Sequence, residues 1–208
     1  MFRRRFYQDF VLKFLYSSPF KMPFWTKQQR GRLKGEEYKI HSEDSCMPHK
    51  ATIELFRNDM KFSSAHFTIF NRTERERLHG HNYYVHSVVE AYYIEPGITY
   101  DYSDTRKQII SICRSLNEYM LLPQHSPYLK IIEENEFYKV LFHTDTMYFL
   151  KKDTLILPLM NITSEELARY FVEKLCVDED DLRNKKIASL NVSVSTTLGQ
   201  RSGYLRSF

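Results

Sequence analysis

Residues 78–93 read L-H-G-H-N-Y-Y-V-H-S-V-V-E-A-Y-Y. The part from 82 to 93 is rich in β-branched and aromatic residues, which favour strands. Two earlier segments of the same kind, 51–58 (ATIELFRN) and 61–70 (KFSSAHFTIF), are separated only by residues 59–60. Short strands with short connections pair most readily in the antiparallel sense. We therefore expect this part of the chain to form an antiparallel sheet.

Two helices are predicted farther along the chain. In Ser103–Met120 the apolar residues recur at intervals of three or four, which is typical of a helix with one buried stripe. The second helix is expected to begin at Thr163, which forms a T-x-x-E capping box with Glu166. Further strands are predicted at 137–159 and 186–197. Strands that alternate with two helices in this order predict an α+β domain.

The composition is that of a folded protein. The chain has 208 residues, of which 42% are apolar and 27% charged, so one domain with a core is expected. The three cysteines are isolated from one another, which argues against a disulfide scaffold and a thiolate metal cluster and favours a reducing compartment. No apolar run approaches the roughly 18 residues of a membrane span. We therefore predict a cytoplasmic protein.

The charge is concentrated at the start of the chain. Residues 1–35 contain nine Lys or Arg and a single Asp, a net charge of +8, so the remainder carries −4 within a total of +4. We interpret residues 1–48 as a basic extension that is disordered or directs the protein to an organelle, and residues 49–208 as the folded domain. Contact of the extension with a membrane surface is a weaker alternative. Because the domain is mildly acidic, no nucleic-acid partner is expected.

Three histidines give the strongest chemical signal. His79 and His81 are two residues apart, so within a strand their side chains lie on one face. His66 belongs to the neighbouring predicted strand. Three neutral imidazoles on one face are typical of a catalytic zinc site with an open fourth position. The alternative is a group of hydrogen-bonded or solvent-facing histidines.

The segments F-S-S-A-H (62–66) and R-E-R-L-H-G-H-N-Y (75–83) together resemble the zinc motif of the 6-pyruvoyltetrahydropterin synthase family, which includes the 6-carboxytetrahydropterin synthases. The similarity extends over about residues 50–206, through G-I-T-Y-D-Y (97–102), L-N-E-Y-M-L-L-P (116–123), L-P-L-M-N-I-T-S-E-E-L-A (157–168) and N-V-S-V-S-T-T (191–197). The resemblance implies the tunnelling fold, an antiparallel sheet backed by two helices. Subunits of that fold join their sheets into an oligomeric barrel, as a homohexamer or another trimer-based assembly.

The resemblance assigns the zinc ligands to His66, His79 and His81. Many members of the family have a cysteine base shortly before the histidine pair, whereas this chain has Glu76 there. Glutamate occupies that place in a subgroup associated with 6-hydroxymethyl pterin products, and a carboxylate near zinc is a suitable proton acceptor. The alternative for Glu76 is an exposed loop charge.

Other family positions are altered. The family's Asp-His pair falls on Asn117, which cannot ionise, and Glu118, which is a candidate for proton transfer or else a solvent-exposed helix residue. Thr163 and Glu165 match one pterin-contact motif. The glutamate expected in the last strand falls on Thr196, which offers a hydroxyl but no charge.

By this resemblance the protein is expected to be a zinc-dependent lyase of pterin metabolism, of the kind found in tetrahydrobiopterin biosynthesis. Its substrate would be 7,8-dihydroneopterin triphosphate and its product a 6-pyruvoyltetrahydropterin or a 6-hydroxymethyl pterin. The altered positions keep two alternatives open. One is a catalytically impaired relative that serves as a binding or assembly subunit. The other is the same fold and metal acting on a different nitrogen heterocycle.

Overall fold

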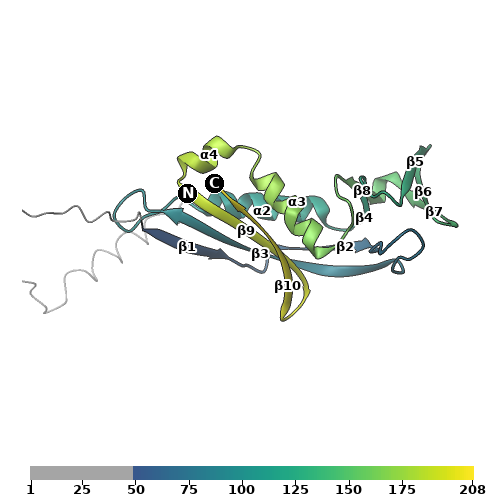
Figure 1. Cartoon of the computed structure of the whole chain (residues 1–208), viewed down its shortest axis with the longest axis horizontal. Coiled ribbons are helices and arrows are strands. Elements are labelled where there is room, and N and C mark those ends of the chain that lie inside the picture. Colours follow the sequence, from purple (N-terminus) through teal and green to yellow (C-terminus); the bar gives the residue numbers. More distant parts are fainter. Residues whose placement is uncertain (1–48) are drawn as a thin grey trace, which may run out of the picture. The chain divides into compact units, whose positions relative to one another are not determined.

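The central strand of the main sheet is β3 (His79–Tyr92), which is long enough to pair with two strands along one edge (Figure 1). Its later part pairs with β1 (Lys50–Leu55) and its earlier part with β2 (Lys61–His66), both antiparallel. Along the opposite edge β3 pairs with β9 (Ile187–Thr197), which in turn pairs with β10 (Gln200–Ser207). The alternation of buried and exposed residues along β3 gives this sheet one apolar face.

The predicted antiparallel pairing of the segments that form β1, β2 and β3 is confirmed, but the complete sheet is mixed. Strand β4 (Tyr119–Pro123) runs parallel to β2, and β8 (Thr154–Leu157) runs parallel to β4. Parallel neighbours need long connections. The helix α2 (Ser103–Leu116) lies within the first connection, and a separate small sheet lies within the second.

The small sheet consists of β5 (Lys130–Glu134), β6 (Phe137–Phe142) and β7 (Asp145–Leu150), which we call the accessory sheet. Its strands are antiparallel, and a 3-10 turn, η1 (Lys151–Asp153), leads from it to β8. Figure 1 shows it at one end of the described structure. It shares a hydrophobic cluster with the end of the main sheet and the segment after β2, made of Phe67, Ile69, Met120, Leu122, Val140 and Phe142.

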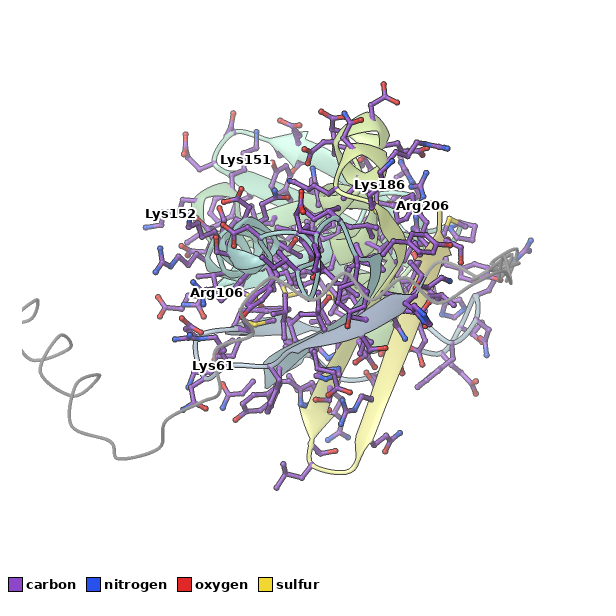
Figure 2. All side chains as sticks on the ribbon, turned by 90° about the vertical axis from the view of Figure 1, so that its left-hand side faces the viewer. Lys61, Arg106, Lys151, Lys152, Lys186 and Arg206 are labelled. Carbon is purple, nitrogen blue, oxygen red and sulfur yellow. The ribbon has the colours of Figure 1, made fainter. Side chains whose placement is uncertain are left out.

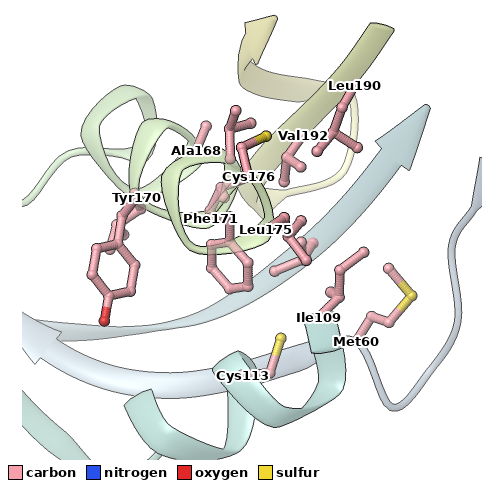
Figure 3. Close-up of a cluster of buried hydrophobic side chains, with 14 of the residues drawn as sticks. Met60, Ile109, Cys113, Ala168, Tyr170, Phe171, Leu175, Cys176, Leu190 and Val192 are labelled. Atoms are coloured by element: carbon pink, nitrogen blue, oxygen red, sulfur yellow. The ribbon is translucent and has the colours of Figure 1, made fainter. Parts of the chain in front are cut away.

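The helices α2, α3 (Ser164–Leu175) and α4 (Glu179–Asn184) lie on one side of the main sheet (Figure 1). The main core fills the space between them and the sheet, where Ile109 and Cys113 of α2 face the α3 side chains (Figure 3). Phe171 of α3 is fully buried and contacts Phe62 of β2, with the ring centroids 6.1 Å apart. This packing fixes the helices against the strand that ends at His66.

Two predicted details change at the helix ends. The predicted helix over Ser103–Met120 is too long, because α2 ends at Leu116 and Glu118 has φ of 67°, in the left-handed region. Helix α3 begins as predicted, since the Thr163 hydroxyl accepts a hydrogen bond from the Glu166 amide at 3.4 Å. The Glu166 carboxylate, however, accepts from the Met160 amide at 3.0 Å, upstream of the helix.

The structure is a computed structural model, which describes residues 49–208. The predictions made for residues 1–48 lie outside the described residues and stay predictions. Within the described part of the chain, no helix is both long and apolar enough to cross a lipid bilayer.

Candidate metal centre and substrate site

The pairing of β2 with β3 brings the three histidines together. His66, the last residue of β2, lies directly opposite His79, the first residue of β3, and His81 follows on the same face. The ring centroid of His66 lies 4.7 Å from that of His79 and 5.3 Å from that of His81. Each histidine offers one ring nitrogen as a ligand atom, and these three nitrogens all lie within 4.8 Å of one another. The strand register is therefore the physical cause of the cluster.

Backbone carbonyls fix the orientation of two of the rings. Nδ1 of His66 lies 2.8 Å from the Ile162 carbonyl, and Nδ1 of His79 lies 2.7 Å from the Arg77 carbonyl. Since a carbonyl oxygen only accepts, each Nδ1 donates and each Nε2 is left with its lone pair. Nε2 of His66 is buried without a hydrogen-bond partner, and the Nε2 atoms of His79 and His81 are 2.9 Å apart. This is the orientation that carbonyl partners impose on metal-binding imidazoles.

The arrangement fits a divalent metal ion. Nitrogen ligands that lie 2.0–2.1 Å from a tetrahedral zinc are about 3.3 Å from one another. The Nε2 atoms of His79 and His81 are 2.9 Å apart, and the three ligand atoms lie within 4.8 Å of one another, so small side-chain shifts would bring them to that spacing. Burial lowers the pKa of His66 and of His81, and the neighbouring His79 lowers both further. Metal binding needs the neutral imidazole, and a lowered pKa favours that form. The buried lone pair of His66 is otherwise an uncompensated polar group.

Glu76 lies beside this cluster. Its amide donates to the Thr68 carbonyl at 2.8 Å, and its Oε2 accepts from the Thr68 amide at 3.0 Å. The same oxygen is 4.0 Å from Nε2 of His79. Partial burial acts to raise the pKa of Glu76, but the hydrogen bonds from Thr68 outweigh it and hold the pKa below its ordinary value. The carboxylate is thus ionised at neutral pH and fixed in place, unlike a free loop charge.

Asn117 and Glu118 lie in the connection between α2 and β4, so the interpretation of Glu118 as a helix residue is wrong. Asn117 accepts from the Ser63 amide through Oδ1 at 2.9 Å, and the Glu118 amide donates to the Ser63 carbonyl at 2.7 Å. These bonds attach the start of β4 to β2. The Glu118 side chain is exposed, and it borders an open hollow that His81 also lines.

The predicted substrate-binding residues occupy the start of α3 and the end of β9. Ile162, whose carbonyl orients His66, directly precedes Thr163, so the helix start is tied to the histidine cluster. Glu165 accepts from the Ser202 hydroxyl of β10 at 2.9 Å. Thr196 is partly buried on β9, which borders β3 on the edge opposite β2. The structure therefore links Thr163 closely to the histidines and Thr196 less directly.

Three residues near the cluster were not singled out by sequence reasoning. Asn161 exchanges two hydrogen bonds with the backbone of Ile69, at 3.1 and 2.8 Å. The Tyr83 hydroxyl is buried without a partner, and its ring lies edge-on to His66. Arg75 contacts both Glu76 and the accessory sheet. Asn161 lies inside one of the quoted motifs, whereas nothing in the local sequence separates Arg75 from exposed arginines nearby.

The sequence profile described as 6-pyruvoyl tetrahydropterin synthase matches residues 55–205. A Methanocaldococcus jannaschii protein, provisionally named 6-carboxy-5,6,7,8-tetrahydropterin synthase, is 28% identical over 153 residues, which cover 70% of this chain and 89% of that protein.

Solved structures agree with the profile. The 6-pyruvoyl tetrahydropterin synthase of Plasmodium falciparum superposes with a TM-score of 0.72 at 26% identity, over 76% of this chain and 99% of that one. The Plasmodium vivax enzyme gives the same TM-score and identity over 77% of this chain and 99% of its own. Two further P. vivax structures carry replacements of a glutamate described as a catalytic residue. The predicted α+β fold class is thereby confirmed.

Proposed function

The chain belongs to the 6-pyruvoyl tetrahydropterin synthase family, and on that premise we propose that it is a zinc-dependent lyase acting on 7,8-dihydroneopterin triphosphate. The observation that carries the proposal is the convergence of three imidazole nitrogens within 4.8 Å, with an ionised carboxylate 4.0 Å from one of them. A metal site beside a proton acceptor is the combination that lyase chemistry at a substrate side chain needs.

His66, His79 and His81 would hold the zinc ion. Zinc bound there would polarise a hydroxyl or carbonyl oxygen of the substrate side chain. Glu76 would accept a proton from that side chain, because it is ionised at neutral pH and its position is fixed by Thr68. Glu118 borders the same hollow as His81. It would carry a further proton between the substrate side chain and solvent.

Pterin binding is proposed for the start of α3. The Glu165 carboxylate is exposed and ionised, because hydrogen bonds that include its own backbone amide lower its pKa. A carboxylate accepts two hydrogen bonds from the adjacent N–H groups of an aminopyrimidine edge. Thr163 and the Thr196 hydroxyl would add neutral contacts. Because Thr196 carries no charge, we propose weaker anchoring on that side of the heterocycle.

The identity of residue 76 also bears on which pterin product is formed. The P. vivax enzyme that resembles this chain has a glutamate described as catalytic, and this chain has a glutamate rather than a cysteine before its histidine pair. We propose side-chain cleavage to a 6-hydroxymethyl pterin as the reaction, with formation of a 6-pyruvoyltetrahydropterin as the competing outcome.

We further propose that copies of the chain associate through their sheets. Strands β10 and β8 end the main sheet, so each leaves one edge without a partner within the described residues. Tyr204 and Leu205 on β10 are exposed apolar side chains, at 41% and 59%. Pairing of such edges between copies would satisfy the backbone groups, as expected for a homohexamer or another trimer-based assembly.

A second candidate is a subunit that binds a ligand or assembles without catalysing a reaction. Asn117 favours it, because its amide oxygen is used in attaching β4 to β2 and the side chain cannot ionise. A protein that has lost one proton-transfer partner can still bind metal and a heterocycle.

The test is to incubate the zinc-loaded, full-length protein with 7,8-dihydroneopterin triphosphate and to follow pterin products by chromatography and mass spectrometry. A parallel sample is treated with chelator and then given zinc again. A product that chelator abolishes and zinc restores supports the lyase, and its mass identifies the reaction. No product from folded, zinc-replete protein contradicts the lyase. Calorimetry with the same pterin then tests the binding subunit.

A further inference from the structure

The segment between His66 and His79 is a closed hairpin. The paired backbone and side-chain bonds between Thr68 and Glu76 form its base, and a bridge joins Ile69 to Arg75. At its tip the Asn71 side chain accepts from two successive backbone amides, those of Thr73 and Glu74. Because these bonds give the hairpin a defined shape, Glu76 moves only if the hairpin moves.

Arg75 joins this hairpin to the accessory sheet. Its Nη1 donates to the carbonyl of Glu76 at 2.9 Å, and its Nη2 donates to Oδ2 of Asp145 on β7 at 2.8 Å. The guanidinium lies 5.1 Å from the ring centroid of Phe67 and 5.8 Å from that of Phe142. One ring belongs to the hairpin and the other to β6, so the cation contacts both units.

These contacts distinguish Arg75 from ordinary surface arginines. Its side chain is 19% exposed, and the ion-pair partner Asp145 is 51% exposed. Only a planar guanidinium has N–H groups directed both to a carbonyl and to a carboxylate while its face stacks on aromatic rings. Lysine, with one compact ammonium group, satisfies one of these partners at a time.

We propose that Arg75 is a positioning residue for Glu76, and that the accessory sheet supports it through Asp145. This inference rests on the proposed function, in which the Glu76 carboxylate accepts the proton. Arg75 holds the backbone of Glu76 and Asp145 holds the outer end of Arg75. The carboxylate consequently keeps its distance from His79, and small displacements of a reacting group cost much of its rate.

The accessory sheet thus has a role in the reaction although it carries none of the proposed site residues. Its shared cluster with the hairpin includes Phe67 and Phe142, the two rings that contact Arg75. Loosening the contact at Asp145 is expected to act on the hairpin first, because the histidines are held separately by β2–β3 pairing.

The experiment compares Asp145→Ala and Arg75→Lys with the control Glu133→Ala in the full-length protein. Glu133 is also an acid of the accessory sheet in an ion pair, with Lys151 at 2.9 Å, and Lys151 lies at the periphery in Figure 2. Hydrogen–deuterium exchange of a peptide covering residues 67–78 reports the hairpin directly. Zinc content and melting temperature report the metal site and the fold.

Exchange of this peptide should be about five-fold faster in Asp145→Ala than in the wild type, as expected for a lost exposed ion pair, and unchanged in Glu133→Ala. Wild-type exchange in Asp145→Ala overturns the inference whether or not the protein is a lyase. If Asp145→Ala fails to fold, the same exchange measurement is made on Asp145→Asn, which keeps an acceptor oxygen but has no charge.

Where turnover is measurable, Arg75→Lys should lower kcat about ten-fold with KM, zinc content and melting temperature near wild-type values. If only the positive charge of Arg75 mattered, Arg75→Lys would have the kcat of the wild type. That result would contradict a positioning role for the guanidinium. Absence of turnover in the wild type counts against the proposed function and leaves the exchange result to decide the inference.

Discussion

Replacing Glu76 with glutamine tests whether the carboxylate takes part in the reaction. Glutamine has nearly the same shape, and its amide oxygen can still accept from the Thr68 amide, which Glu76 contacts at 3.0 Å. The replacement removes the negative charge and the ability to accept a proton. The hairpin and the histidines should therefore keep their places, while the chemistry loses its base.

The expected loss follows from the role of the carboxylate. A positioned general base contributes about 10²- to 10⁴-fold, which corresponds to about 3 to 5 kcal/mol of transition-state stabilisation. The neutral amide also weakens one charge-assisted hydrogen bond from Thr68, at about 1 kcal/mol of folding free energy. Turnover should thus fall by at least two orders of magnitude while the melting temperature falls by only a few degrees.

The assay measures steady-state kcat and KM for pterin product formation, together with bound zinc per chain. Glu74→Gln is the matched control, because Glu74 lies in the same hairpin and its carboxylate accepts from Asn71 at 2.7 Å, away from the histidines. Glu74→Gln should retain wild-type kcat. Turnover within three-fold of wild type in zinc-replete Glu76→Gln would show that Glu76 is not the base.

The remaining predictions concern the fold and its ionisable groups. Phe171→Ala, at a fully buried site, should lower the free energy of unfolding by about 3 to 5 kcal/mol in chemical denaturation, whereas Val177→Ala, at 81% exposure, should change it little. A hydrogen bond from Arg169 lowers the pKa of Glu166 below its ordinary value of 4.5. The ionised carboxylate therefore stabilises the fold above pH 4.5, and this stabilisation is lost as the pH falls through the lowered pKa. Glu166→Gln should therefore destabilise the protein more at pH 7 than at pH 3, and an equal deficit at both would contradict this sign. Burial raises the pKa of the Cys113 thiol to about 12, so a maleimide at pH 8 should label this thiol only after unfolding. Peptide mass spectrometry reads the labelling, and labelling of the native protein would show that the core opens.

The sequence predicted the parts of the fold that depend on local patterns. Period-two alternation predicted that His79 and His81 share a face, and His66 was expected on a neighbouring strand. The strand pairing confirms both expectations, whereas the direct opposition of His66 and His79 was seen only in the structure. The hydroxyl of Thr163 likewise caps α3 as its T-x-x-E pattern indicates. The family resemblance supplied the expected fold, which the comparisons confirm.

Other features depend on contacts between distant segments. Met120 continues the apolar spacing of α2, yet the backbone turns at Glu118, because β4 pairs beside β2 through bonds from Ser63. Strand β10 was not predicted, since most of its residues are exposed and it has no clear alternation. The role of Arg75 arises from a strand some 70 residues away, so no local pattern indicates it.

The metal content of the protein shows whether His66, His79 and His81 hold a zinc ion. Full-length wild-type protein and His79→Ala are loaded with zinc, passed through a desalting column and measured by mass spectrometry of the metal. His79 contributes one of the three converging nitrogens and is partly exposed, so its removal should leave the core intact. We expect about one zinc per wild-type chain and little in the variant. A full zinc complement in folded His79→Ala would contradict the assignment of the metal to these three histidines.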